Sequence, residues 1–491
     1  MDELMAQRVA KLDQLRDIGM APYPTRATRT HTTAQATAIV EALPEGQDEA
    51  AGQEVTVAGR IVARRDMGKA TFIDLLDGSG RIQVLLRKNQ LSEQLYDALR
   101  LVDLGDFIGV TGTPMRTRTG QPTVGATAWV MLTKALHAPP EKYHGLTDPE
   151  LRQRQRYLDL MANEETRERF LARSKVVAGI RRFLENRGFI EVETPVLQEL
   201  AGGAAARPFV THYNALAEDR FLRISLELHL KRLLIGGFER VFELGRIFRN
   251  EGLGAKYNPE FTMLETYEAY ADYISVMEMV EDMVSTVAKE AFGRSVFTFR
   301  DHEIDLSPPW RRITFHDALR EYGDLELDEF PTEDTLRDEL KRRGVEVPPG
   351  AGYGKLADEA MSHYVEPNLI QPTFLLDYPV ELSPLAKRKP ENPRLVERFE
   401  AFIGGFEAGN AYTELNDPID QRARFEEQLR LRAQGDEEAE LVDEDFLFAL
   451  EHGMPPTGGF GMGIDRLLMI LTGQPTIREV ILFPQLRSVK D

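Results

Sequence analysis

Charged and aromatic side chains gather on two alternating apolar runs between Arg240 and Tyr267. The runs flank a loop rich in glycine, lysine and asparagine, a pattern that predicts a β-hairpin. Because buried charge is costly unless it is paired, this arrangement favours a pocket for a charged substrate over a solvated hairpin. Period-two alternation places two sets of side chains on strand faces: Gly245, Ile247, Arg249 and Glu251 on the first strand, and Phe261, Met263, Glu265 and Tyr267 on the second.

Two arginines stand beside glycine-rich segments. Arg249 ends the first strand of the predicted hairpin, and Arg466 lies near the start of an apolar helix that follows GGFGMG. If both side chains point into one cavity, their planar guanidinium groups suit the oxygens of a triphosphate. A single arginine near a helix start is more often solvated, but the pair favours a phosphate site.

Two glutamates, Glu400 and Glu407, lie on either side of the sequence FIGG. With phosphates nearby, such carboxylates would hold Mg²⁺, which prefers oxygen ligands. The spacing by itself is weak, since two glutamates in an acidic chain also fall this way by chance.

A second acidic group follows on the next predicted strand, where Asn410, Tyr412 and Glu414 share one face. Together with Glu265 and Tyr267 they predict an acidic cavity with aromatic walls. A buried ammonium group needs carboxylate partners and lies favourably against aromatic faces, so the cavity suits a small cation. The alternative is that these groups pair with local arginines.

Upstream, residues 51–135 hold five short β-like runs, with a helical stretch after the third. This order predicts a five-stranded barrel of the oligonucleotide-binding (OB) type. A generic small barrel is the alternative, because barrels of this size bind many things. Arg64, Arg65, Lys69 and Phe72 favour nucleic acid, since a base can stack on an aromatic ring while basic groups hold phosphates. Phe72 taken alone is more often a half-buried core residue.

The other segments complete an α+β chain with an antiparallel sheet. We expect a helical extension over 1–50, the barrel over 51–135, a linker over 136–165 and the main domain over 166–491. A solvated helical insertion is predicted near 325–370, and a strand broken by Pro195 is core or a subunit contact. No phosphate-binding-loop or dinucleotide-binding glycine fingerprint is present.

Composition and charge are those of an acidic protein with one weakly basic module and without a membrane span. The chain has 491 residues, no cysteine and a net charge of −20. Residues 51–134 carry a net +3 and the remainder −23, which leaves a weakly basic module on an acidic body. No apolar run approaches the roughly 18 residues of a membrane span, and the charged N-terminus is unlike a secretory signal, so a cytoplasmic protein is expected.

These motifs together resemble the class II lysyl-tRNA synthetases of the bacterial type along nearly the whole chain. FIEVETPVL resembles the family's motif one, FRNEG with YNPEFTMLE its motif two, and GMGIDR its motif three. GGAAARPF, ELSPLAKR and NAYTELND resemble its lysine-specific signatures. The barrel resembles its anticodon-binding domain.

The resemblance implies a ligase that makes lysyl-adenylate from L-lysine and ATP with Mg²⁺ and then charges tRNA(Lys) at the 3′-hydroxyl of the terminal adenosine. It also implies a homodimer formed through the region of Pro195. By matching position, the catalytic residues would be Arg249, Glu251 and Arg466, the ATP site would add Asn258 and Phe261, and the magnesium ligands would be Glu400 and Glu407. The side chains of the lysine pocket would be Glu227, Glu265, Tyr267, Asn410, Tyr412 and Glu414. The anticodon would be read by Arg64, Phe72 and Gln83.

Four positions depart from the family pattern, among them Phe406 and Ala408, which differ from several relatives beside the intact carboxylates of the expected magnesium site. Tyr257 stands where many relatives have histidine before NPEF, and Gln121 stands where a glutamate often follows the glycine of the barrel loop. Three alternatives stay open: an aspartyl- or asparaginyl-tRNA synthetase, an enzyme that attaches lysine to a protein, and a non-catalytic paralogue. The acidic pocket disfavours the first, the barrel the second, and the intact arginines and glutamates the third.

Overall fold

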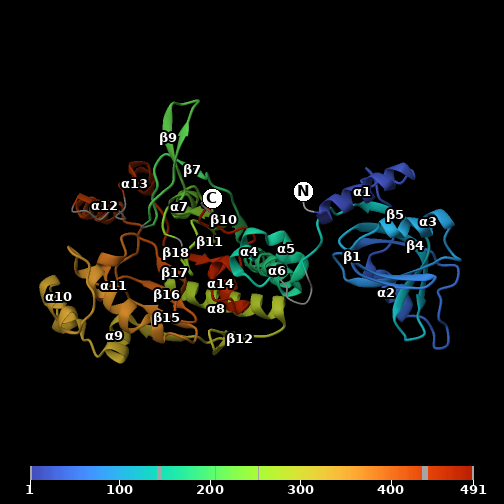
Figure 1. Cartoon of the computed structure of the whole chain (residues 1–491). Coiled ribbons are helices and arrows are strands. Elements are labelled where there is room, and N and C mark those ends of the chain that lie inside the picture. The colour runs from blue at the N-terminus through green and yellow to red at the C-terminus, as the bar shows by residue number, and fades with distance from the viewer. Residues whose placement is uncertain (1–2, 141–145, 205, 253, 434–440, 489–491) are drawn as a thin grey trace. The chain divides into compact units, whose positions relative to one another are not determined.

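The computed structural model describes residues 3–140, 146–204, 206–252, 254–433 and 441–488. The chain divides into two compact units, Met1–Thr147 and Asp148–Asp491. Within the described residues, no helix is long and apolar enough to cross a membrane. Figure 1 shows a small barrel in the first unit and a large sheet with helices in the second, which confirms the predicted α+β class.

The first unit is a closed barrel with strand order β1-β2-β3-β5-β4. Valine, isoleucine and leucine alternate inward and are almost fully buried, and Trp129 and the short helices close the core. The predicted five strands and the helix after the third are confirmed: β1 (Val55–Met67), β2 (Ala70–Leu76), β3 (Arg81–Arg87), α3 (Glu93–Asp97), η1 (Ala98–Leu101), β4 (Phe107–Arg116) and β5 (Pro122–Thr133).

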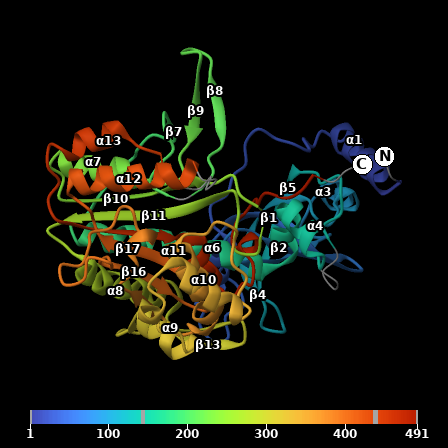
Figure 2. The ribbon, with the colours of Figure 1, turned by 90° about the vertical axis from the view of Figure 1, so that its left-hand side faces the viewer.

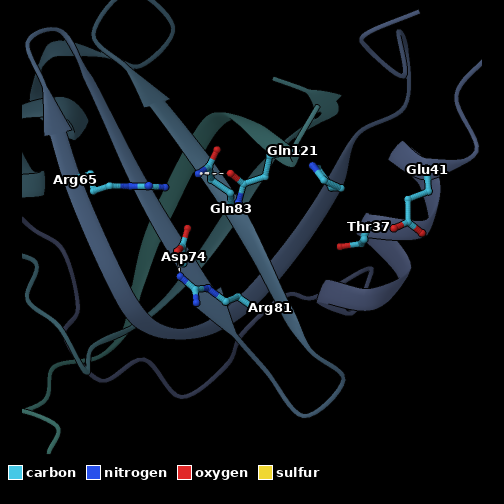
Figure 3. Close-up of a pocket in the computed structure, with 8 residues that line it drawn as sticks. Thr37, Glu41, Arg65, Asp74, Arg81, Gln83 and Gln121 are labelled. Carbon is cyan, nitrogen blue, oxygen red and sulfur yellow. Dashed lines mark hydrogen bonds and ion pairs between the residues drawn. The ribbon is translucent and has the colours of Figure 1, made fainter. Parts of the chain in front are cut away.

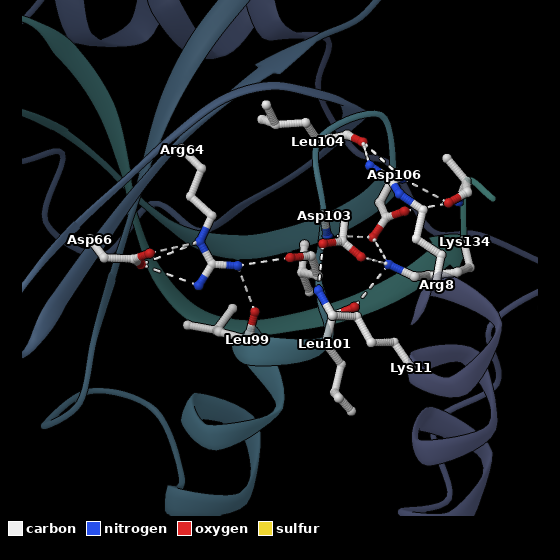
Figure 4. A network of polar contacts seen from close by, with 12 residues as sticks. Arg8, Lys11, Arg64, Asp66, Leu99, Leu101, Asp103, Leu104, Asp106 and Lys134 are labelled. Atoms are coloured by element: carbon white, nitrogen blue, oxygen red, sulfur yellow. Dashed lines mark hydrogen bonds and ion pairs between the residues drawn. The ribbon is translucent and has the colours of Figure 1, made fainter. Parts of the chain in front are cut away.

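Two helices precede the barrel, α1 (Glu3–Asp17) and α2 (Thr33–Glu41). The α1 helix is bonded to the barrel through polar side chains (Figure 4): Arg8 Nη1 donates to Ala135 O at 2.9 Å, and Lys11 Nζ lies 2.6 Å from Asp103 Oδ1. The α2 helix begins at a capping box formed by Thr32 and Gln35, which satisfies its first backbone donors.

The second unit contains an eight-stranded sheet of order β14-β15-β16-β17-β18-β11-β10-β6. All neighbours are antiparallel except the edge pairs β14–β15 and β10–β6. Its strands are β6 (Ile190–Glu191), β10 (Arg240–Phe248), β11 (Glu260–Ala269), β14 (Arg311–Thr314), β15 (Thr373–Leu376), β16 (Arg398–Phe402), β17 (Glu407–Thr413) and β18 (Thr457–Gly463). Smaller sheets are formed by β7 (Leu197–Gln198), β8 (Val210–Tyr213) and β9 (Glu218–Leu222), and by β12 (Val296–Phe299) and β13 (His302–Asp305).

Helices cover both faces of this sheet (Figures 1 and 2). On one face Phe242, Leu264 and Phe460 pack against α6 (Glu164–Asn186), α8 (Tyr273–Phe292) and α14 (Ile464–Leu471). On the other, Val241, Ile247 and neighbouring residues pack against α7 (Glu227–Ile235), α12 (Pro418–Ala433) and α13 (Glu444–Leu450). Alternate residues of one strand therefore serve two separate cores.

The helices predicted near 325–370 pack on the end of the sheet. They are α10 (Glu333–Arg342) and α11 (Tyr353–Tyr364), with the short turns η2 (Leu327–Glu329) and η3 (Glu366–Asn368). Together with α9 (Phe315–Gly323), these helices bury a leucine-rich core against β15 and β16.

The predicted linker 136–165 contains α4 (Pro149–Arg154) and α5 (Arg156–Ala162), whose side chains form hydrogen bonds with the C-terminal segment. The remaining short turns are η4 (Val380–Leu382) and η5 (Ile477–Glu479).

Two local expectations differ from the structure. The first hairpin strand ends at Phe248, so Arg249 and Glu251 follow it, although Arg249 N still donates to Pro259 O at 2.8 Å. The segment GGFGMG, which the sequence suggested only as a glycine-rich lead into a helix, forms strand β18 in the middle of the sheet. Glycine is a weak strand former, which hid this strand, but here it leaves room above the sheet.

Candidate active site and nucleic-acid interface

The site is built on two adjacent rungs of the sheet, each crossing four strands. One rung pairs Glu265, Gly461, Asn410 and Glu400 in register, and the next pairs Tyr267, Gly459, Tyr412 and Arg398. Residues in register point to the same face of a sheet, so these side chains share one surface. Because β18 contributes glycine to both rungs, the surface is a trough with β18 as its floor. A Cβ built at Gly461 would meet only atoms 3.7 Å or more away.

Three carboxylates lie at one end of this trough. Glu265 is anchored by Ser225, Leu226 and Tyr267: its Oε1 accepts from Leu226 N at 2.9 Å and from Ser225 Oγ at 3.1 Å, and its Oε2 from Tyr267 OH at 3.2 Å. Glu227 Oε2 accepts from Tyr412 OH at 2.7 Å. Glu414 follows the end of β17 and is 1% exposed. The predicted lysine-pocket side chains are thus brought together, except that Asn410 accepts from Arg398 Nε at 3.0 Å.

A lysine of the chain itself lies among these acids. The Lys231 Nζ atom is 2.5 Å from Glu227 Oε1 and 2.5 Å from Glu414 Oε2, and the side chain is fully buried. It also lies over the Tyr412 ring, 5.6 Å from its centroid. The open alternative that the acids pair with basic groups of the chain therefore holds in part, with a lysine in place of an arginine.

One carboxylate oxygen in this group has neither a hydrogen bond nor an ion pair with the described residues. Glu414 Oε1 is buried and makes no hydrogen bond with any group in the part of the chain that the structure describes. It lies against Gly459, where a Cβ would come within 1.8 Å of it. A buried acceptor without a donor is costly, so Oε1 is the natural contact for an entering cation.

The pKa shifts agree with an excess of negative charge. Burial, reinforced by the Glu227 charge, raises the pKa of Glu265 to about 7. Burial also raises the pKa of Glu414 well above its usual value, although the Lys231 charge opposes the rise. For Lys231, burial alone would lower the pKa, but Glu227 and Glu414 raise it. The pocket therefore keeps its own ammonium charged and still favours a further cation.

Two arginines of the predicted phosphate site lie near one another at the other end of the sheet. Arg249 Nε donates to Ile224 O at 3.3 Å, and its guanidinium lies 5.4 Å from the centroid of the Phe261 ring. Arg466 Nη1 donates to Glu407 O at 3.0 Å and to Glu407 Oε2 at 3.2 Å. Burial lowers the pKa of Arg249, opposed by several carboxylates and reinforced by the Arg466 charge. Two arginines close enough to lower one another's affinity for a proton favour an anion between them.

The start of α14 is fixed by Asp465, which positions Arg466. Asp465 Oδ2 accepts from Thr262 N at 2.7 Å, and Oδ1 from Arg173 Nη1 at 2.5 Å. The Arg466 guanidinium lies 5.7 Å from the centroid of the Tyr257 ring. The tyrosine that departs from the family pattern thus faces the phosphate-site arginine with a flat aromatic surface.

The two glutamates of the predicted magnesium site follow on β16 and β17. Glu400 Oε1 accepts from Arg398 Nη2 at 2.6 Å, and Glu407 is 41% exposed beside Arg466. Burial raises the pKa of Glu400 to about 7; Arg398 opposes the rise and the Glu407 charge adds to it. Two oxygen donors that repel one another fit a divalent cation. No cluster of three or more acidic or histidine side chains among the described residues offers a metal a complete protein site.

Two residues predicted for the ATP site, Asn258 and Glu251, lie in the described part of the chain and form no hydrogen bond or ion pair with Arg466 or with the two glutamates. Asn258 is 5% exposed, and its amide donates to Glu260 O at 2.6 Å while its carbonyl accepts from Gln485 N at 3.3 Å. It therefore fastens the hairpin tip to the C-terminal segment. Glu251 is exposed beyond the end of β10, near enough to act on the charge of Arg249.

A separate cavity of about 540 Å³ lies on the barrel, between β1, β2, β3, β5 and α2 (Figure 3). Gln83 is held in it from both sides: its Nε2 donates to Gln121 Oε1 at 3.2 Å, and its Oε1 accepts from Thr123 Oγ1 at 3.1 Å. Arg81 forms an ion pair with Asp74 in the same cavity. The cavity combines fixed amides with two arginines and two carboxylates, Asp74 and Glu41, and so offers polar groups that can bond a base.

The structure brings Arg65, and not Arg64, to this surface. Arg65 lines the cavity and is in register with Phe72, so the two share a face of the barrel. Arg64 Nη1 donates to Leu99 O at 2.7 Å and to Val102 O at 2.8 Å (Figure 4). Its guanidinium thus caps the last carbonyls of η1, which is a structural task.

Three functional positions were missed from the sequence. Lys231 lies four residues after Glu227, a helical spacing that places both on one face of α7. Arg398 lies two residues before Glu400 on the same strand face, and Gly459 precedes Gly461 by two. Each spacing was visible, but only the register between distant strands shows that these residues meet.

The comparisons with known proteins agree with this geometry. Residues 148–487 match the family of class II tRNA synthetases (D, K and N), and residues 55–132 match the OB-fold nucleic-acid-binding domain. A lysine–tRNA ligase from Dehalococcoides mccartyi is 54% identical over 99% of this chain and 98% of its own. Those from Moorella thermoacetica and Bacillus subtilis are 53% and 48% identical, over 100% and 99% of this chain and 99% and 97% of their own. The chain therefore belongs to the class II tRNA synthetases and, within them, to the lysine–tRNA ligase family.

Proposed function

We propose that the protein activates L-lysine with ATP to lysyl-adenylate and pyrophosphate and then transfers the lysyl group to tRNA(Lys). The acidic end of the trough carries this conclusion: Glu227, Glu265 and Glu414 outnumber the one ammonium that lies among them. L-Lysine brings two ammonium groups, which suits this excess of negative charge.

In this scheme Glu414 Oε1 accepts a hydrogen bond from the ε-ammonium, and Glu265 and Glu227 hold the other cationic group. Tyr267 and Tyr412 form the walls. The arrangement fixes the lysine carboxylate toward the arginine end of the trough, where it attacks the α-phosphate. Catalysis is then by positioning and charge neutralisation, with no covalent intermediate on the enzyme.

ATP lies at the arginine end. Arg249 neutralises the α-phosphate during attack, Arg466 holds the γ-phosphate, and the adenine stacks on Phe261 beside Glu251. Glu400 and Glu407 would hold Mg²⁺, which supplies neutralisation of the phosphate charge when bound. Asn258 contributes by holding the hairpin tip that borders this site.

The barrel reads the anticodon of tRNA(Lys), with a base stacked on Phe72 and another group bonded by Gln83. Arg65, one of the basic residues expected to hold phosphates, takes the place in anticodon binding that the resemblance implied for Arg64. We also propose a homodimer through the region of Pro195, because Ile190, Val196 and Leu197 are about half exposed there. A tRNA-charging role places the protein in the cytoplasm with its tRNA substrate.

ATP–pyrophosphate exchange with each of the twenty amino acids tests this proposal. Exchange strongest with L-lysine, followed by charging of purified tRNA(Lys), is the expected result. Strongest exchange with aspartate or asparagine would favour the first alternative, and exchange without tRNA charging would favour lysine transfer to a protein. No adenylate with any amino acid would indicate a non-catalytic paralogue.

A further inference from the structure

We infer that Lys231 is a positioning residue of the amino-acid pocket: it fixes which oxygen of Glu414 meets the substrate and sets the number of cationic charges that the pocket accepts. The inference rests on the proposed lysine activation. Lys231 itself lies on α7, which packs on the face of the sheet that carries the trough; it is fully buried and is not a group that reacts.

The first part follows from the pairing of oxygens. Lys231 Nζ takes one oxygen of Glu414 and one of Glu227, each at 2.5 Å. The second oxygen of Glu227 is taken by Tyr412. Neither oxygen of Glu414 accepts a hydrogen bond of good geometry from the described residues, but Oε2 is held in the ion pair with Lys231, so Oε1, which lies against Gly459, is the oxygen with neither contact. A carboxylate held at one oxygen presents the other in a fixed direction.

The second part follows from the charges that face one another. Glu227 and Lys231 come from α7, Glu265 and Tyr267 from β11, Tyr412 from β17, and Glu414 from the residue after it. With all three carboxylates ionised, the single ammonium leaves two negative charges, which equals the two ammonium groups of L-lysine. Without Lys231 the pocket would hold three negative charges, and a proton on Glu414 would compete with the substrate.

The barrel offers a matched control. Lys134 is also fully buried between two carboxylates, with Nζ 2.6 Å from Asp103 Oδ2 and 2.8 Å from Asp106 Oδ2. Its third donor bonds Leu101 O at 2.9 Å. Lys134→Met removes the same kind of charge, at the same burial, from a network that we place outside amino-acid binding.

The experiment compares Lys231→Met, Lys231→Arg and Lys134→Met in full-length protein by ATP–pyrophosphate exchange with L-lysine. Lys231→Met is expected to raise the lysine KM roughly 100-fold, with the ATP KM changed less than about threefold. Its lysine KM should depend more steeply on pH than the wild-type value does, because Glu414 loses the neighbouring charge that favours its ionised form. Lys231→Arg, which keeps the charge but not the length, should raise the lysine KM about tenfold and retain the wild-type pH profile. Lys134→Met should lower the melting temperature and leave the lysine KM unchanged.

A lysine KM within about threefold of wild type in Lys231→Met would overturn the inference. If that variant does not fold, Lys231→Arg decides: a raised lysine KM with an unchanged ATP KM supports the positioning role, and no change in either overturns it. An equal rise of the lysine and ATP KM values would also overturn it, because this indicates general damage. Wild-type protein without lysine-dependent exchange would instead refute the proposed function.

Discussion

Two buried lysines, Lys231 in the catalytic unit and Lys134 in the barrel, are each paired with two carboxylates, but the charges around them balance in the barrel and not in the catalytic unit. Each is fully buried, and each lies within 2.8 Å of two carboxylates. Around Lys134 the charges balance, because Lys11 also pairs with Asp103 (Figure 4). Around Lys231 they do not, because Glu265 adds a third carboxylate that forms no ion pair with a cation in the described part of the chain.

The acids of the two networks report this difference in their pKa values. Although burial raises the pKa of Asp103, Lys11 and Lys134 outweigh it and hold that pKa below its usual value. For Glu414, burial outweighs Lys231 and the pKa is raised. A network that satisfies itself stabilises a fold, whereas one with an unpaired acceptor is arranged for a ligand.

The largest effect expected from this contrast is that of Glu414→Gln. The substitution keeps the shape of the side chain but removes a buried charge partner, which costs roughly 3–5 kcal/mol. The lysine KM should therefore rise by roughly two to four orders of magnitude, with little change in the ATP KM. Exchange kinetics at varied lysine and ATP measure both constants.

Asp103→Asn is the matched change in the balanced network. It should lower the melting temperature and leave the lysine KM at its wild-type value. A Glu414→Gln enzyme with normal lysine KM, or an Asp103→Asn enzyme with a raised one, would erase the distinction between the two networks.

A smaller effect is expected from Gly459→Ala, which sharpens the contrast without removing a charge. The new Cβ would meet Glu414 Oε1 at 1.8 Å and Tyr267 Cε1 at 2.7 Å, so the free oxygen must move. Overpacking of this kind costs about 1–3 kcal/mol, and the lysine KM should rise roughly 10- to 100-fold. Gly461→Ala is the control: its Cβ would first meet Glu265 Cγ at 3.7 Å, and its effect should be clearly smaller. Equal effects would show that Glu414 Oε1 is not the sensitive atom.

The sequence predicted most of the members of the site and less of their arrangement. Alternation along single strands was enough to group Glu265 with Tyr267, and Tyr412 with Glu414, because each pair depends on local geometry alone. The barrel was predictable for the same reason, since its five strands alternate clearly and glycine turns mark several ends. The glycine strand β18 lacked any such pattern, although it separates the two pairs and forms the floor between them.

Pairings between distant segments were out of reach. Lys231 appeared as an ordinary helix residue because its partner Glu414 lies 183 positions later in the chain. Arg64 and Arg65 were indistinguishable by type, and the register irregularity between Ile61 and Ala63 is what decides which of them faces the cavity. A bulge shifts every later side chain to the opposite face, and no local signal in the strand marks its position.

In the barrel, three alanine substitutions test which side chains contact the tRNA. Phe72→Ala should raise the tRNA KM by roughly 10- to 100-fold, the equivalent of about 1–3 kcal/mol for one stacked base, and leave lysine-dependent exchange unchanged. Arg65→Ala should act in the same direction and become less harmful at low salt. Arg64→Ala should lower the melting temperature, because Leu99 and Val102 lose their donor. A reduced exchange rate in Phe72→Ala would place this residue outside anticodon recognition.

The smallest effect is a pH dependence that only the unbalanced network should show. Glu265 has a pKa of about 7 in the free protein, raised by burial and by the Glu227 charge. A bound lysine cation favours the ionised carboxylate and lowers that pKa, so binding near pH 6.5 must release protons. Lysine affinity should therefore increase as the pH rises through about 7, by at most about tenfold per pH unit for each proton released.

The raised pKa of Glu265 also determines how the stability of the folded protein changes with pH. A carboxyl group with a folded-state pKa above its unfolded value opposes folding as the pH rises from about 4.5 to about 7. Bound lysine should recover this loss, so the stabilisation of the protein by lysine should be larger at pH 8 than at pH 6. Calorimetric titration in two buffers of different ionisation enthalpy counts the protons released. Lys134→Met should release as many as the wild type, because the barrel carboxylates lie outside the amino-acid pocket, and proton uptake on lysine binding would contradict the assignment of Glu265 to the pocket.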